Sequence, residues 1–103
     1  MKIHRKAEFR ADRSWGSEML MGMGEHQVRL HWTDQPYRWH VNSGDEVFVV
    51  LDGRVEMYFG PEGAEQVEVL DPGDTAVLKS GERHLAKPVG EARVLVIERH
   101  DSD

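Results

Sequence analysis

The segment HVNSGDEVFVVLDG, residues 40–53, decides the fold. It opens with His40, Asn42 and Glu46, three polar side chains that can bind a metal ion, and continues into a run rich in Val and Phe. Such a run is typical of a β-strand, and the Asp-Gly pair that ends it predicts a hairpin turn. In an extended chain His40 and Asn42 share one face, and Glu46 can point back at the same space.

Short β-type runs continue on both sides of this segment. We expect strands at 28–32, 46–51, 54–59, 66–70, 75–78, 84–87 and 93–98. Gly, Pro and Asp residues separate the runs about every ten residues, and no helical period lasts for three turns. The sequence therefore predicts an all-β fold, an antiparallel barrel or sandwich.

The chain of 103 residues is long enough for a single domain. We expect residues 1–26 to form an irregular N-terminal arm that packs on the barrel or on a dimer partner, residues 27–98 to form the barrel, and residues 99–103 to form a tail. The strand from Glu46 to Leu51 is apolar on both faces. One face should fill the barrel and the other should meet a second sheet or subunit, so we expect a homodimer.

Composition excludes several classes of function. The formal net charge of −6 leaves no broad basic surface, so neither nucleic acid nor a membrane surface is an expected partner. The chain has no cysteine, which excludes disulfides, thiolate metal sites and a cysteine nucleophile. Residues 1–15 lack the apolar region of a secretory signal, and no apolar run is long enough to span a bilayer. We expect a cytoplasmic protein.

A second histidine could join the first cluster. His84 begins a predicted strand after Lys79-Ser80-Gly81, and antiparallel pairing could bring it beside His40 and Glu46. Two imidazoles and a carboxylate would leave positions open on a divalent ion for water or substrate. A hydrogen-bonded structural role for these histidines remains the alternative.

At these residues the sequence resembles the cupin family. The first cupin motif reads Gly, five residues, His-x-His, three or four residues, Glu, six residues, Gly, and is similar to the segment from Asp34 to Gly53. The second motif reads Gly, five residues, Pro-x-Gly, two residues, His, three residues, Asn, and is similar to the segment from Gly73 to Pro88. Six anchors match in order, namely His40, Glu46, Gly53, Gly73, Gly81 and His84. Four depart, with Asp34, Asn42, Lys79 and Pro88 at positions of Gly, His, Pro and Asn.

The resemblance implies a single-domain jelly-roll barrel, a homodimer and one divalent metal ion, which could be Fe, Mn, Ni or Zn. Cupins usually hold their metal with three His and one Glu, so Asn42 stands where an imidazole is expected. Asn42 could coordinate through its oxygen, or it could step back to hydrogen-bond a ligand or water. A barrel that has lost its metal is a further alternative.

The remaining candidates would bind a small-molecule substrate. Trp39, Val41, Phe48 and Met57 are candidates for an apolar wall, with ordinary core packing as the alternative for Phe48 and Met57. Arg29, His31 and Lys79 could orient an anionic group at the barrel mouth, with surface exposure as the alternative for each. The leading hypothesis is a metal-dependent enzyme, dioxygenase-like or isomerase-like, that acts on a small polar carboxylate or carbonyl compound. A non-catalytic small-molecule-binding or sensing cupin and a purely structural barrel are the alternatives.

Overall fold

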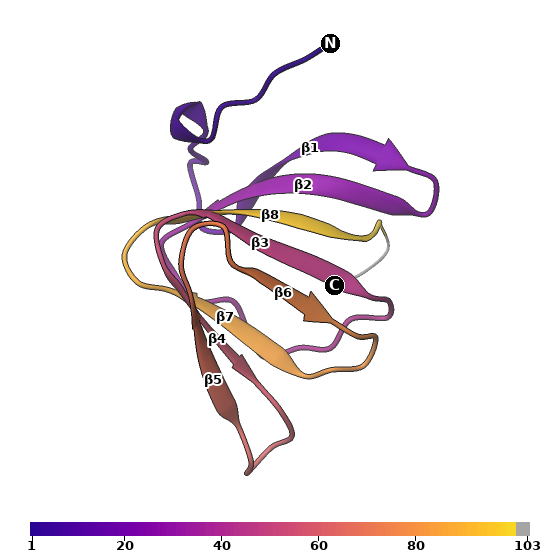
Figure 1. Cartoon of the computed structure of the whole chain (residues 1–103), viewed down its shortest axis with the longest axis vertical. Helices are drawn as coiled ribbons and strands as arrows, with labels where there is room; N and C mark the ends of the chain where they lie inside the picture. Colours follow the sequence, from indigo (N-terminus) through magenta and orange to yellow (C-terminus); the bar gives the residue numbers. More distant parts are fainter. Residues whose placement is uncertain (101–103) are drawn as a thin grey trace.

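The computed structural model describes residues 1–100 of the chain (Figure 1). After a short 3-10 helix, η1 (Lys6–Glu8), all described regular structure is β-strand. The strands are β1 (Gly16–Met23), β2 (His26–Thr33), β3 (Glu46–Asp52), β4 (Val55–Phe59), β5 (Gln66–Leu70), β6 (Thr75–Leu78), β7 (His84–Pro88) and β8 (Ala92–Arg99). The all-β prediction is confirmed. Of the expected tail at 99–103, residues 101–103 lie outside the described residues.

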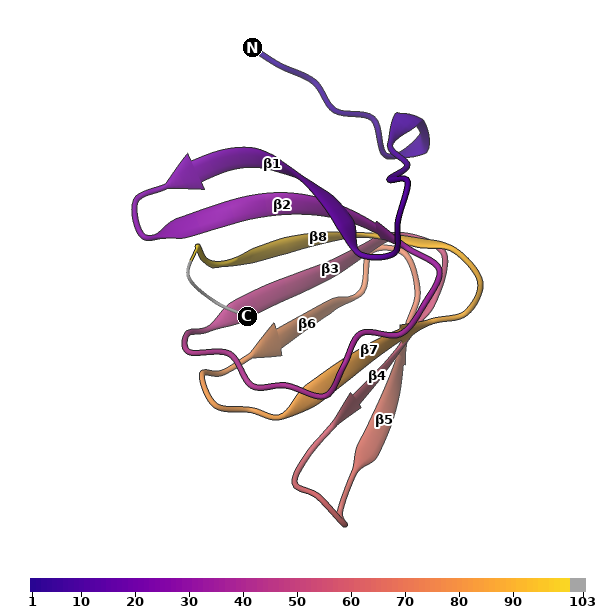
Figure 2. The same ribbon diagram turned by 180° about the vertical axis from the view of Figure 1, so that it is seen from behind.

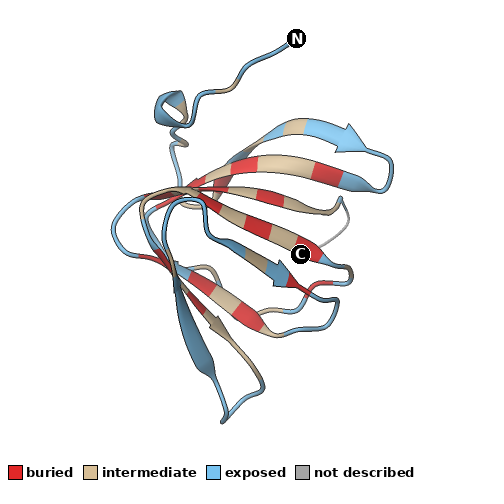
Figure 3. Ribbon diagram, viewed as in Figure 1, coloured by how far each residue is buried: buried red, intermediate tan, exposed pale blue. Residues whose placement is uncertain are grey.

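The strands form two antiparallel sheets that face each other in a jelly-roll barrel. The larger sheet has the order β1-β2-β8-β3-β6, and the smaller has the order β5-β4-β7 (Figure 1). Buried residues alternate with less buried ones along β3, β4, β7 and β8 (Figure 3), as expected when one face of each strand lines a core. The core combines Phe48, Val50, Val94 and Val96 from the larger sheet with Val55, Met57 and Ala86 from the smaller one.

The hairpin between β3 and β4 requires a glycine. Gly53 has a φ of 80°, a backbone conformation that L side chains rarely adopt. A Cβ built at Gly53 would also lie 2.2 Å from the carbonyl oxygen of Glu91. The Asp-Gly signal in the sequence therefore reflects both a turn and a close approach of two backbones.

The segment between β2 and β3 lies along β7 (Figure 2). Tyr37 N–H donates to the carbonyl of Ala86 over 2.9 Å, and Gly81 N–H donates to the carbonyl of Asn42 over 3.0 Å. Between these two bonds, His40 pairs with His84 in an isolated antiparallel bridge. The expected extended strand from His40 to Asn42 is thus reduced to one bridge, because the chain turns at residues 43 and 44 to enter β3.

Strand β1 lies where we expected an irregular arm. Its pairing with β2 shifts register between Met19 and Met21, which leaves Leu20 as an extra residue. This bulge interrupts the alternation that marks a strand, and Gly is a weak strand former, so the sequence pattern did not indicate β1. The residues before β1 do lie against the larger sheet: Arg93 Nε donates to the carbonyl of Phe9 over 2.6 Å, and the Arg10 guanidinium lies 5.1 Å from the Trp32 ring centroid.

One apolar row crosses the outer face of the larger sheet. In register, it runs through Met21, Val28, Ile97, Val47 and Val77, one residue from each strand. The residues at the two ends of the row are exposed: 59% of Met21 and 66% of Val77 is accessible to solvent. Among residues 1–100, no helix is long and apolar enough to cross a membrane.

Candidate metal centre

The bridge between His40 and His84 brings two imidazoles together. Each residue donates its backbone N–H to the carbonyl of the other, over 3.1 and 3.0 Å. Both side chains therefore leave the backbone on the same side of the pair, and their ring centroids lie 4.3 Å apart. His84 is the first residue of β7 and is buried, whereas His40 is half-buried.

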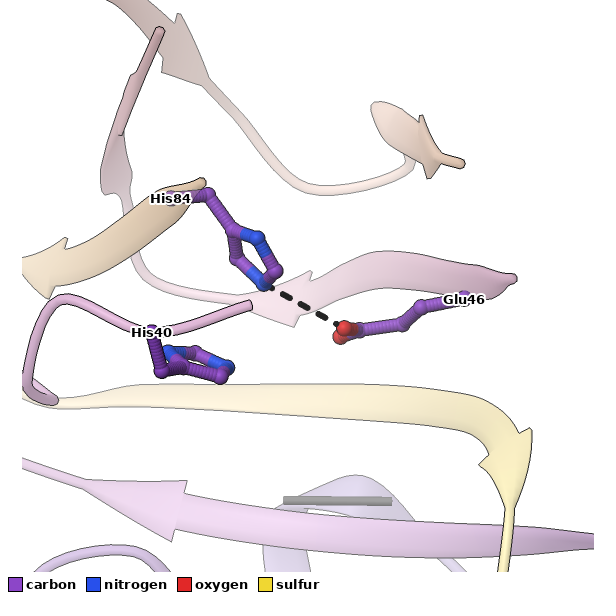
Figure 4. Close-up of side chains that lie close together, drawn as sticks. All are labelled: His40, Glu46 and His84. Carbon is purple, nitrogen blue, oxygen red and sulfur yellow. Dashed lines mark ion pairs between the residues drawn. The ribbon is translucent and has the colours of Figure 1, made fainter. Parts of the chain in front are cut away.

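Glu46 faces the two imidazoles from the larger sheet (Figure 4). It is the first residue of β3, its side chain points into the barrel, and only 6% of it is exposed. Its Oε1 lies 3.4 Å from His84 Nε2. One ligand atom from each of His40, Glu46 and His84 lies within 4.8 Å of the other two, close enough to share one metal ion.

Hydrogen bonds fix which nitrogen each histidine presents. His40 Nδ1 lies 2.9 Å from the carbonyl oxygen of Arg38, and His84 Nδ1 lies 2.9 Å from that of Glu82. A carbonyl oxygen can only accept, so both Nδ1 atoms carry the proton. Each Nε2 then keeps its lone pair for the centre of the cluster, the arrangement typical of histidines that bind metal.

Asn42 supports this cluster through Glu46. Its Nδ2 donates to Glu46 Oε1, and only 3% of the residue is exposed. Its Oδ1 is buried and has no hydrogen-bond partner among the described residues. With the amide nitrogen turned to Glu46, the side chain orients the carboxylate and stabilises its negative charge by donating a hydrogen bond.

The charge of Glu46 also acts on His84. Burial by itself disfavours the imidazolium of His84. Hydrogen bonds to Glu46 and to the carbonyl of Glu82, together with the negative charges of the same residues, outweigh this effect. The pKa of His84 therefore lies above its ordinary value of 6.5. A proton that binds His84 Nε2 would therefore compete with a metal ion for the same lone pair.

The three side chains open into a cavity of about 160 Å³ inside the barrel. Its other walls come from both sheets, from the segment before β3 and from the end of the N-terminal arm. They are formed by Trp15, His31, Tyr37, Phe48, Ala86, Val96 and Glu98. Most of this wall is apolar or aromatic, so the cluster faces a space with few competing polar groups.

Two of the residues expected to bind substrate lie on the inner side of β2. His31 lines the cavity, and burial lowers its pKa below the ordinary value despite a hydrogen bond to the backbone of Trp15. Arg29 does not line the cavity, and its Nη1 donates to Ser17 Oγ over 3.1 Å.

Trp39 and Met57 lie elsewhere, in the smaller half of the barrel. The ring of Trp39 packs under the guanidinium of Arg83, 3.8 Å from ring centroid to Cζ. Met57 is buried in the hydrophobic core and is not among the residues that line this cavity. Val41 is exposed rather than part of an apolar wall, whereas Phe48 lines the cavity as expected.

Five of the residues that line the cavity were not predicted from the sequence, namely Trp15, Tyr37, Ala86, Val96 and Glu98. Trp15 lies in a stretch that we interpreted as an arm, and Tyr37 lies in a loop beside the turn at Pro36. Glu98 lies directly opposite Glu46 in register, a pairing that only the order of the strands reveals. Large aromatic residues in otherwise polar loops were the available signal for the first two.

Comparison with protein families agrees with this architecture. The profile of the cupin domain family matches residues 24–98, which is most of the chain and includes all three candidate ligands. The chain belongs to the cupin family. The resemblance recognised from the two motifs is thereby confirmed, although no curated protein matches the chain in sequence.

Solved structures show the same cupin fold. A cupin-2 domain protein from Shewanella frigidimarina is 24% identical with a TM-score of 0.77, and the match covers 87% of this chain and 85% of that one. A protein from Thermus thermophilus is 23% identical with a TM-score of 0.77, over 96% and 97% of the two chains. Iron(II) HppE in complex with its substrate is 17% identical with a TM-score of 0.71, over 81% of this chain and 53% of that one.

The donor set of this cupin fits a divalent metal ion. Two neutral imidazoles and one carboxylate suit Zn²⁺ and the divalent ions of iron, manganese and nickel. Each imidazole is hydrogen-bonded to a backbone carbonyl, and the carboxylate accepts a hydrogen bond from the amide of Asn42. These bonds hold the three groups in place without the ion. Three protein ligands would leave further coordination positions open toward the cavity.

Proposed function

We propose that this cupin binds one divalent metal ion through His40, Glu46 and His84. The observation that carries the proposal is the convergence of the three ligand atoms within 4.8 Å at the wall of a cavity. The protonated Nδ1 atoms of both histidines support it, because they leave Nε2 available. Asn42 is proposed to hold Glu46 rather than to coordinate, since its amide nitrogen faces that carboxylate.

We further propose that the protein is a metal-dependent enzyme that acts on a small carbonyl- or carboxylate-bearing molecule. A bound ion would act as a Lewis acid that polarises substrate oxygens. Glu46 would serve as a ligand, while Phe48, Ala86 and Val96 would exclude water from the reacting group. His31, neutral because burial lowers its pKa, would contact the substrate from β2.

Metal analysis tests the first proposal. Protein purified without an affinity tag should contain about one equivalent of metal, or take it up after anaerobic reconstitution, and His84→Ala should lose it. His26→Ala is the matched control, because His26 is exposed at the start of β2 and should leave the metal content unchanged. Equal metal contents in the wild type and in His84→Ala would refute the site.

A homodimer is proposed from the apolar row on the outer face of the larger sheet. The row offers side chains from all five strands, and Met21 and Val77 at its ends are mostly exposed. Light scattering should give twice the monomer mass, and Val77→Asp should shift the mass toward that of the monomer. A monomeric wild type at working concentration would contradict the proposal.

A further inference from the structure

A continuous row of aromatic rings runs from the candidate ligands to the N-terminal arm. The ring centroids of His84 and His40 lie 4.3 Å apart, those of His40 and Tyr37 4.9 Å, and those of Tyr37 and Trp15 5.4 Å. The Trp15 ring also contacts His31 edge-on at 6.0 Å. The cavity thus presents ring faces and edges to whatever occupies it beside the metal ligands.

The Trp15 ring is held in place by several contacts. Its Nε1 donates to the carbonyl of Gln35 over 2.8 Å, and its side chain packs against the core. The backbone of Trp15 has a φ of 57°, which is uncommon for a residue other than glycine. A residue held in this conformation by its surroundings is a candidate for a functional role.

The size of the cavity limits its occupant. An apolar cavity of about 150 Å³ in another protein accepts benzene. The cavity here, about 160 Å³, therefore fits roughly one six-membered ring with small substituents. The cavity is partly open, so a larger molecule would extend beyond it.

The charges around the cavity limit the occupant further. Two carboxylates, Glu46 and Glu98, line it, and no Lys or Arg does so among residues 1–100. The guanidinium of Arg38 lies outside the lining, where it donates to the hydroxyl of Tyr37 over 2.8 Å. Away from the ion, an anionic group on the substrate would therefore lie near these carboxylates, with no lining cation among residues 1–100 to pair with.

From these constraints we infer that the substrate is a small planar molecule, about the size of one ring, that offers a pair of oxygens to the metal and carries no charge elsewhere. The planar part would lie against Trp15 and Tyr37, because aromatic contacts favour a flat partner. This inference rests on the proposed function, since the oxygen pair requires the ion.

The experiment uses zinc-loaded protein and two probes that differ by one charge. Catechol has a planar ring and two adjacent oxygens, and 3,4-dihydroxybenzoate adds a carboxylate at the far side of the same ring. Zinc titration comes first, and calorimetry then measures each probe. We expect catechol to bind at least about tenfold more tightly, because the added carboxylate would be buried without a partner.

Variants of Trp15 test the aromatic wall. Trp15→Ala should weaken catechol binding about three- to tenfold with zinc affinity unchanged, and Trp15→Phe should keep most of the binding. Equal or tighter binding of the carboxylate probe, or no binding of catechol to the zinc-loaded protein, would overturn the inference and leave the metal site intact. Failure of the wild type to bind zinc would instead overturn the proposed function on which the inference depends.

Discussion

Replacing Asn42 by Ala tests how the candidate ligand Glu46 is held. The buried carboxylate of Glu46 accepts from Asn42 Nδ2 and lies 3.4 Å from His84 Nε2. The substitution removes a hydrogen bond to a charged group, a loss of about 1.5–3 kcal/mol of stability. For a domain of this size, that loss corresponds to a decrease in Tm of roughly 6–24 °C in the metal-free protein.

Metal affinity should fall as well. Loss of a group that orients a metal ligand typically costs about 10–100-fold in affinity. Competition against a chromophoric chelator measures this change, and thermal unfolding of the metal-free protein measures the change in stability. Absorption of the cobalt(II)-loaded protein separates the two roles of Asn42: a supporting residue leaves the ligand bands in place, whereas loss of a direct ligand alters them.

Asn42→Asp is the matched variant, because it keeps the volume and removes the donor. The new carboxylate would face Glu46, and the repulsion should raise the pKa of one of the two groups. The metal-free variant should therefore be less stable than the wild type at neutral pH and should recover part of the loss in acid. Unchanged metal affinity in Asn42→Ala would refute the supporting role.

Three further predictions concern pH and the hairpin. Because the pKa of His84 lies above 6.5, protons should compete with metal already near neutral pH. Metal affinity should fall about tenfold per pH unit below that pKa. A metal affinity that does not change between neutral pH and pH 6 would contradict this prediction. Burial lowers the pKa of His31, so the unfolded chain takes up a proton at 6.5 that the folded chain takes up only at lower pH. Stability of the metal-free protein should thus decrease on acidification below pH 6.5, and His31→Gln should lessen that decrease, as measured by thermal unfolding across pH. Gly53→Ala should cost about 2 kcal/mol or more, because its Cβ meets backbone at φ 80°, whereas Gly73→Ala, with open space around it at φ 92°, should cost only about 1 kcal/mol. Equal losses of stability by urea unfolding would show that the close approach at Gly53 is unimportant.

Much of the barrel could be predicted from local pattern. The strands from Glu46 onward carry Val, Phe and Ile between clear turn residues, and their observed bounds differ from the expected ones by one residue or less. His40, Glu46 and His84 could be grouped because the two motifs gave their order and spacing. Their convergence depends on the pairing of residue 40 with residue 84, which spacing alone does not determine.

The parts that could not be predicted depend on contacts between distant residues. Strand β1 is held by its pairing with β2 and by a bulge, neither of which leaves a periodic signal. Trp39 was a candidate for an apolar wall, yet its ring packs under Arg83. Trp15 lines the cavity and has a left-handed backbone conformation, and a sequence pattern indicates neither.

Trp15 lies outside the segment that the cupin family profile matches, so different stretches of the gene encode the metal ligands and this part of the cavity wall. The candidate ligands His40, Glu46 and His84 lie within residues 24–98, whereas the indole that closes the aromatic row comes from before that segment. Exchange of residues 1–15 between related proteins would therefore alter which molecules enter without changing a ligand. Libraries that vary only this stretch offer a route to new selectivity on an unchanged metal site.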